Sequence, residues 1–187
     1  MFQFHKRVLG LSVGLVMLTL LILGSTATAF ADGGPVTATA DLGGGALSAT
    51  ATVVNTTGFV LSGADQTYSY TLPVAMTDAT GSNLGWNLTI SSSQFTSGPD
   101  TLSTNASSIT AVAITDGTGI APTASTLSHD YTSPLPINAT AAKFFSATAG
   151  TGTGSSTITP TIDVAVPAGT TAGSYTSTIT VASVSAP

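Results

Sequence analysis

The sequence predicts an all-β protein, a single antiparallel β-sandwich of Ig-like or related Greek-key type with about eight to ten strands. Three observations support this fold class. Apolar and polar residues alternate in many short runs, long helix-forming residues are scarce, and turn residues recur between the runs. The chain contains no cysteine, so a domain of this size depends on its packed core for stability.

The N-terminus has the order of a secretory signal peptide, with basic residues before an apolar run and small residues after it. The apolar run from Val8 to Leu23 is shorter than the roughly 20 residues that cross a membrane comfortably. Signal cleavage fits after either Ala29 or Ala31. We expect it after Ala31, so that residues 1–31 are the signal peptide and residues 32–187 form a secreted domain without membrane insertion.

Each expected strand is a run whose apolar residues share one face. In the first half of the chain, these runs are residues 36–42, 47–53, 59–61, 67–72 and 74–76. A turn-like stretch then leads to the only tryptophan, in "GWNLTIS". In that run Trp86, Leu88 and Ile90 share one face, which we predict to be a core face rather than a ligand platform.

The second half of the chain continues with longer runs. Residues 108–115 are apolar in both phases of the alternation, so we expect a strand buried on both faces that ends at the Asp-Gly turn of residues 116–119. The proline-rich residues 121–139 are expected to form a long loop or crossover. A further strand contains Pro160, which lacks an N–H and therefore suits an edge or a bulge. Residues 174–184 form the last expected strand.

The charge balance excludes two classes of partner. Residues 32–187 contain one lysine and eight aspartates, which gives a net charge of −7 with histidine neutral. A basic surface for nucleic acid is therefore absent. A cluster of Lys and Arg that would hold the protein on anionic lipid is absent as well.

The residues needed for catalysis are also scarce. Residues 32–187 contain one histidine, His129, and no cysteine or glutamate, and no G-x-S-x-G motif accompanies the many serines. We therefore predict no enzyme activity, no cofactor and no metal site. Four asparagines lie in N-x-Ser/Thr sequons, which leaves N-glycosylation open: Asn55, Asn87, Asn105 and Asn138.

The ordered motifs resemble the WxL-domain family of cell-surface proteins, best known from Gram-positive bacteria. The resemblance rests on "FVLSGADQTYSYTL", "MTDATGSNLGWNLTISSSQF", "AAKFFSATAGTGTGSSTITPTIDVAVP" and "AGTTAGSYTSTITVASVSAP". Trp86-Asn87-Leu88 is the tripeptide that gives the family its name. Where the family typically carries a second W-x-L, on the last strand, this sequence has Val181-Ala182-Ser183.

The resemblance implies a secreted structural or binding module that is held non-covalently at the cell wall by peptidoglycan or another wall polymer. The family-motif residues Trp86 and Leu88 are then architectural. For ligand contact we predict aromatic side chains that reach solvent. Tyr131 lies in the proline-rich region, and the adjacent Phe144 and Phe145 would face opposite sides of a strand, so that one of them is exposed.

Two other functions stay open at this level. The first is a subunit of a surface layer, fibre or adhesin complex that binds other surface proteins through exposed strand edges. The second is a secreted hydrolase, for which His129 and an aspartate would have to converge on a serine in one pocket.

Overall fold

The computed structural model describes residues 39–52, 54, 58–122 and 133–185. The predicted signal peptide, residues 1–31, lies outside these ranges, as do His129 and Tyr131. Residues 42–187 belong to one compact unit, and residues 39–41, which precede it, are exposed and form no strand. The described residues contain no helix, and therefore none that could cross a membrane.

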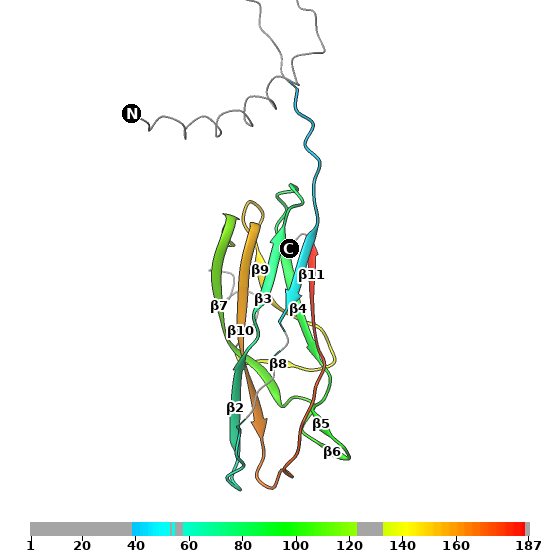
Figure 1. Ribbon diagram of the computed structural model, residues 1–187, viewed down its shortest axis with the longest axis vertical. Helices are drawn as coiled ribbons and strands as arrows, with labels where there is room; N and C mark the ends of the chain where they lie inside the picture. The colour runs from blue at the N-terminus through cyan, green and yellow to red at the C-terminus, as the bar shows by residue number, and fades with distance from the viewer. Residues whose placement is uncertain (1–38, 53, 55–57, 123–132, 186–187) are drawn as a thin grey trace, which may run out of the picture. The chain divides into compact units, whose positions relative to one another are not determined.

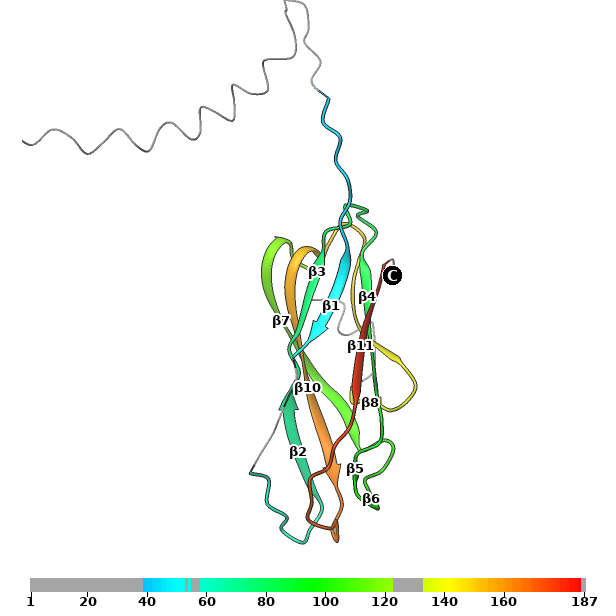
Figure 2. The ribbon, with the colours of Figure 1, turned by 45° about the vertical axis from the view of Figure 1, so that its right-hand side comes forward.

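The fold is an antiparallel β-sandwich with a large sheet and a small sheet, as predicted (Figures 1 and 2). The described residues form eleven strands rather than the expected eight to ten, because a short hairpin adds two. The large sheet has the order β1-β3-β10-β7-β8, with β2 also paired to β10, and the small sheet has the order β11-β4-β9. β5 and β6 form a separate two-stranded hairpin. The strands are β1 (Leu47–Ala51), β2 (Gln66–Thr71), β3 (Val74–Asp78), β4 (Trp86–Ser92), β5 (Thr96–Ser97), β6 (Asp100–Thr101), β7 (Ser107–Ile120), β8 (Leu135–Ile137), β9 (Ala142–Ala147), β10 (Thr153–Val166) and β11 (Ile179–Ser185).

β10 is the central strand of the large sheet. It pairs with β7 on one side, and with both β2 and β3 on the other. β2 and β3 follow one another in the same register, separated only by Leu72 and Pro73. Opposite this junction lies Pro160, which accepts a hydrogen bond from the Leu72 N–H at 3.0 Å but has no N–H to return. Pro160 therefore lies in a central strand, beside a register shift at Thr161/Ile162, rather than at an edge.

The core lies between the two sheets. Its fully buried side chains include Trp86, Leu88 and Ile90 from the small sheet, and Ile158 and Ile162 from the large sheet. The shared face of β4 is thus a core face, as its alternation predicted. The indole N–H donates to the Gly152 carbonyl oxygen at 2.8 Å, so the buried polar end of the tryptophan is hydrogen-bonded.

A second, smaller cluster covers the part of the large sheet around β2. Leu102, Ala106 and Val164 are buried there, and Tyr68 and Tyr70 pack against them. The two tyrosines alternate with exposed residues on β2, as the sequence pattern predicted.

Several expected strand boundaries are wrong. Residues 39–42 and 59–61 were expected within strands but form none, because they pair with no neighbouring strand. β7 is buried on one face only, because the small sheet covers its inner face and Ala111 and Ala113 point to solvent. The Asp-Gly residues 116–119 do not end this strand, which continues to Ile120 opposite β10. The region expected to be a loop contains β8, and the last strand begins later, at Ile179.

The contact between Trp86 and Gly152 yields a prediction on stability. Gly150 and Gly152 both have positive φ, at 85° and 73°. A Cβ at Gly152 would lie 2.7 Å from the indole Nε1, whereas a Cβ at Gly150 would meet nothing within 4 Å. We expect Gly150→Ala to cost about 1 kcal/mol, from backbone strain alone. Gly152→Ala should cost at least about 2 kcal/mol more, from overpacking against a rigid ring.

Urea unfolding, followed by the fluorescence of the single tryptophan, measures both costs. Gly150→Ala is the matched control, because it changes the same residue type at a similar φ. Equal costs for the two variants would contradict the tight packing of the indole on Gly152.

A second prediction concerns alkaline pH. Burial, and then the neighbouring Tyr68, raise the pKa of Tyr70 to about 12, against about 10 in an unfolded chain. Between these values the unfolded state loses the Tyr70 proton while the folded state keeps it. The free energy of unfolding should therefore fall as pH rises from about 10 to about 12. Unfolding measured across this range should show a smaller loss for Tyr70→Phe than for the parent, and an identical loss would contradict the assignment.

Candidate functional site

The residues of the W-x-L motif do not reach the surface. Trp86 and Leu88 are both 0% exposed. The indole ring packs on Phe145, with ring centroids 5.6 Å apart. Ligand contact by these two side chains would require the core to open, so the motif acts on the fold and not as a surface platform.

The prediction that one of Phe144 and Phe145 reaches solvent is wrong, because both are 0% exposed. The reason is a bulge in β9. Leu88 of β4 pairs with Phe145, and the next residue, Thr89, pairs with Lys143, so Phe144 is an extra residue on β9. A bulge changes the direction of the strand's side chains, and here both rings enter the core. Phe144 and Phe145 were predicted to contact a ligand because one of them was expected to be exposed, and neither is. The third predicted contact, Tyr131, lies outside the described residues.

The position of the missing second motif lies beside the first. β11 pairs with β4 so that Val181 is opposite Ile90 and Ser183 is opposite Leu88. Val181 and Ser183 are half-buried and alternate with exposed neighbours. Both motif positions are therefore inward-facing positions on adjacent strands of the small sheet. Val181 and Ser183 thus lie at the edge of the core.

The aromatic side chains that do reach solvent lie elsewhere. Phe59 is 39% exposed, and its ring packs edge-on against Tyr68 with centroids 5.2 Å apart. Tyr68 stacks on Tyr70 at 6.3 Å. Tyr68 and Tyr70 pack against the smaller cluster, and Phe59 packs on Tyr68, so these rings contribute to the packing of this part of the domain.

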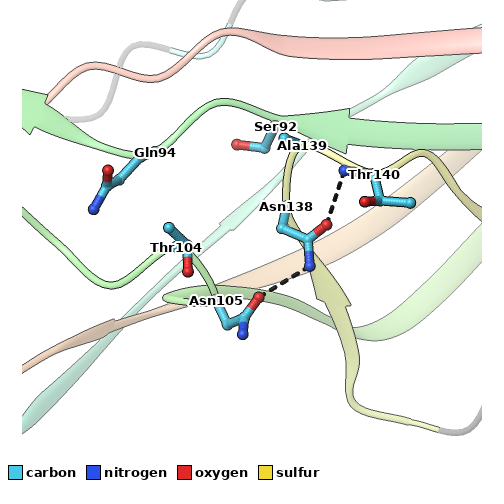
Figure 3. Close-up of a pocket in the computed structure, with 7 residues that line it drawn as sticks. All are labelled: Ser92, Gln94, Thr104, Asn105, Asn138, Ala139 and Thr140. Atoms are coloured by element: carbon cyan, nitrogen blue, oxygen red, sulfur yellow. Dashed lines mark hydrogen bonds between the residues drawn. The ribbon is translucent and has the colours of Figure 1, made fainter.

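An open hollow, lined mainly by residues with hydrogen-bonding side chains, lies on the described surface (Figure 3). It has a volume of about 460 Å³. Three segments that are distant in the sequence form it: the end of β4, the segment between β6 and β7, and the loop between β8 and β9. The lining residues are Ser92, Gln94, Thr104, Asn105, Asn138, Ala139 and Thr140. We call this site the amide hollow.

Asn138 holds the amide hollow together. Its side-chain Nδ2 donates to Asn105 Oδ1 at 3.0 Å, and its Oδ1 accepts a hydrogen bond from the Thr140 N–H at 2.9 Å (Figure 3). Its backbone carbonyl accepts from the Ser92 N–H at 2.8 Å, which fastens the loop to the end of β4. The two side-chain hydrogen bonds fix the orientation of the Asn138 amide. Contact with a ligand would then come from the other residues that line the hollow.

The amide hollow is uncharged and rich in hydrogen-bonding groups. The Asn105 amide nitrogen and the hydroxyls of Thr104 and Thr140 have no hydrogen-bond partner among the described residues. An amide offers both donors and acceptors, and a hydroxyl can do either. This chemistry suits a ligand made of hydroxyl, amide and carbonyl groups, and it offers no cation for a phosphate or carboxylate.

The residues of the amide hollow were not predicted as a site. Asn105 and Asn138 were noticed in the sequence only as members of sequons. These two residues are brought together only by the fold, because a hydrogen bond joins two segments that are 33 residues apart in the sequence. A single sequence contains no pattern that pairs these loops.

Catalytic and metal-binding groups do not gather on the described part of the chain. No group of three or more His, Cys, Asp or Glu residues that could hold a metal occurs there. Three aspartates make hydrogen bonds that fix local structure. Asp78 accepts from the Thr80 N–H at 3.0 Å, Asp163 from the Ser69 hydroxyl at 2.6 Å, and Asp65 from the Ala168 N–H at 2.7 Å.

Comparison with protein families gives a match to the family described as "WxL domain surface cell wall-binding", over residues 43–187. The match spans both sheets, the amide hollow and the W-x-L strand. Comparison with curated proteins and with solved structures gives no match.

The hydrogen bonds of Asn138 lead to a prediction on the stability of the site. Asn138→Ala removes one side-chain donor and one side-chain acceptor, and we expect a cost of about 1 to 2 kcal/mol. Thr140→Ala in the same loop removes a hydroxyl that has no partner within the described part of the chain and keeps the Thr140 N–H, so its cost should stay within about 0.5 kcal/mol. Urea unfolding of both variants measures the difference, and similar costs would show that Asn138 does not support the loop.

Proposed function

The chain belongs to the WxL domain family of surface cell wall-binding domains, and from this premise we propose that it binds peptidoglycan through the amide hollow. A domain of this family is extracellular and associated with the cell wall. The proposal adds the polymer and the place of contact. It treats the protein as a binding module and not as an enzyme.

The uncharged lining of the amide hollow is the observation that carries the proposal. Glycan chains and peptide stems present hydroxyl, carbonyl and N–H groups, and the hollow offers matching partners at Asn105, Thr104 and Thr140. An open site accepts a segment of a long polymer, because the chain can enter and leave along the surface. Many weak polar contacts of this kind give reversible attachment, and repeated contact along the wall raises the total affinity.

The charge of the domain favours peptidoglycan over phosphate-rich wall polymers. Residues 32–187 have a net charge of −7, with Lys143 as their only Lys or Arg. A polyanion would be repelled by this excess of negative charge at low ionic strength. Binding should therefore persist, or increase, when anionic polymers are removed from the wall.

Three of the aspartates make structural hydrogen bonds. Asp65, Asp78 and Asp163 each accept a hydrogen bond that holds a turn or a pair of strands. None of the three lines the amide hollow. A hydrolytic site would need carboxylates or another base in a shared pocket with the substrate.

Sedimentation of the protein with purified wall material tests the proposal. We expect retention on peptidoglycan whose phosphodiester-linked polymers have been removed with hydrofluoric acid. Asn105→Asp keeps the Oδ1 acceptor for Asn138 but replaces the amide nitrogen and adds a negative charge. This variant should lower retention by at least about fivefold, or about 1 kcal/mol of binding free energy.

Asn83→Asp is the matched control, because it makes the same chemical change at an exposed residue that precedes β4, whereas the amide hollow lies at the other end of that strand. Equal retention of both variants and the parent would place wall contact elsewhere on the domain. No retention of the parent above that of an unrelated protein of similar charge would reject peptidoglycan binding itself.

A further inference from the structure

The outer edge of β7 is the longest open strand edge on the described part of the molecule. β10 pairs with β7 along its whole length on one side. On the other side, β8 pairs only with residues 107–109. The stretch 111–120 therefore has no strand beside it among the described residues, and β7 lies at the margin of the large sheet (Figure 1).

The hydrogen bonds around Pro160 show which peptide groups of β7 face outward. The Pro160 carbonyl points away from β7, because it accepts a hydrogen bond from Leu72. Pro160 is opposite Val112. In an antiparallel ladder this makes a non-hydrogen-bonded pair, so the N–H and C=O of Val112 point away from β10. Because peptide groups alternate in direction along a strand, the N–H and C=O of Ile114, two residues further on, also point away from β10.

The Thr110 carbonyl agrees with this direction, because it accepts a hydrogen bond from the Ser133 hydroxyl at the same edge, at 3.0 Å. The outward peptide groups of Val112 and Ile114 are thus donors and acceptors on an open edge. Their side chains are roughly perpendicular to this direction and pack against the core.

The stretch between Thr110 and Asp116 lacks the features that normally protect an edge. Register shifts with β10 lie at either end of it, so the stretch itself is regular. Its exposed side chains, Ala111, Ala113 and Thr115, are small. It contains no lysine, arginine or proline, and Asp116 at its end is the only charge. Natural edge strands usually carry charge, proline or a bulge against pairing with other chains.

We propose that a second copy of this chain pairs its β7 with this edge, antiparallel, about a two-fold axis at Ala113. Ala113 is the midpoint of the regular stretch, which makes the pairing self-complementary. Val112 of one copy then exchanges both backbone hydrogen bonds with Ile114 of the second copy. Asp116 lies opposite Thr110 of the second copy, so the two aspartates do not face each other.

The net charge makes this association dependent on salt. Two domains of charge −7 repel each other, and salt screens the repulsion. The dimer therefore forms more readily at physiological ionic strength than at low ionic strength. It also brings two wall-binding domains together, which raises the retention of each on a polymer.

Crosslinking tests the pairing directly, because the chain has no cysteine. Non-hydrogen-bonded antiparallel pairs bring Cα atoms to about 4.5 Å, within the range of a disulfide. Ala113→Cys should give a covalent dimer under mild oxidation at least about tenfold faster than Ala75→Cys. Ala75 is also exposed, but it lies on β3, which has a strand on both sides. Equal rates for the two variants, or no dimer, would overturn the proposal.

Amide hydrogen exchange and sedimentation velocity of the parent protein complete the test. The amides of Val112 and Ile114 should exchange rapidly in dilute solution and at least about tenfold more slowly where the dimer is populated. Those of Ala111 and Ala113, which face β10, should stay slow throughout. Ala113→Lys should abolish the dimer and leave the free energy of unfolding unchanged.

The alternative is that another segment of the same chain already covers this edge. In that case the amides of Val112 and Ile114 will be protected even in dilute, monomeric protein. That result, or a parent that stays monomeric as salt and concentration rise, would show that no second copy uses the edge.

Discussion

The burial of one indole ring constrains much of this sandwich. A buried Trp86 needs an acceptor for its N–H, and the acceptor is the carbonyl of Gly152, just before β10. This bond ties the central strand of the small sheet to the start of the central strand of the large sheet. The ring also requires the space that a glycine leaves, and it packs on Phe145. The two sheets are therefore fixed relative to each other at this end by a polar contact inside an apolar core.

The sequence predicted the fold class and the core face of β4, because apolar alternation records which side of a strand is buried. It did not predict the direction of Phe144 and Phe145, because alternation fails wherever a bulge inserts a residue. The full length of β7 was also missed. Its Asp-Gly residues are typical of a turn, but here they are held in the strand by pairing with β10. The amide hollow was missed because loops distant in the chain build it.

The strand that carries the W-x-L motif also reaches the amide hollow. β4 begins at Trp86 and ends at Ser92, which lines the hollow and donates its N–H to Asn138. A strand of seven residues thus connects the buried tryptophan with the candidate binding site. If substitution of the tryptophan abolished wall binding, the cause could be a distorted hollow. A direct test of ligand contact therefore needs a folded variant in which a residue of the hollow itself is changed.

The pairing of Asn105 with Asn138 has a consequence for how the protein is produced. Both asparagines begin N-x-Ser/Thr sequons, and they lie side by side at the rim of the amide hollow. A eukaryotic secretory host would offer both positions to its oligosaccharide transfer machinery. A glycan on either side chain would fill the hollow with covalently attached sugar. Such material would not test the binding proposed for the hollow, so a bacterial host is the appropriate source for binding experiments.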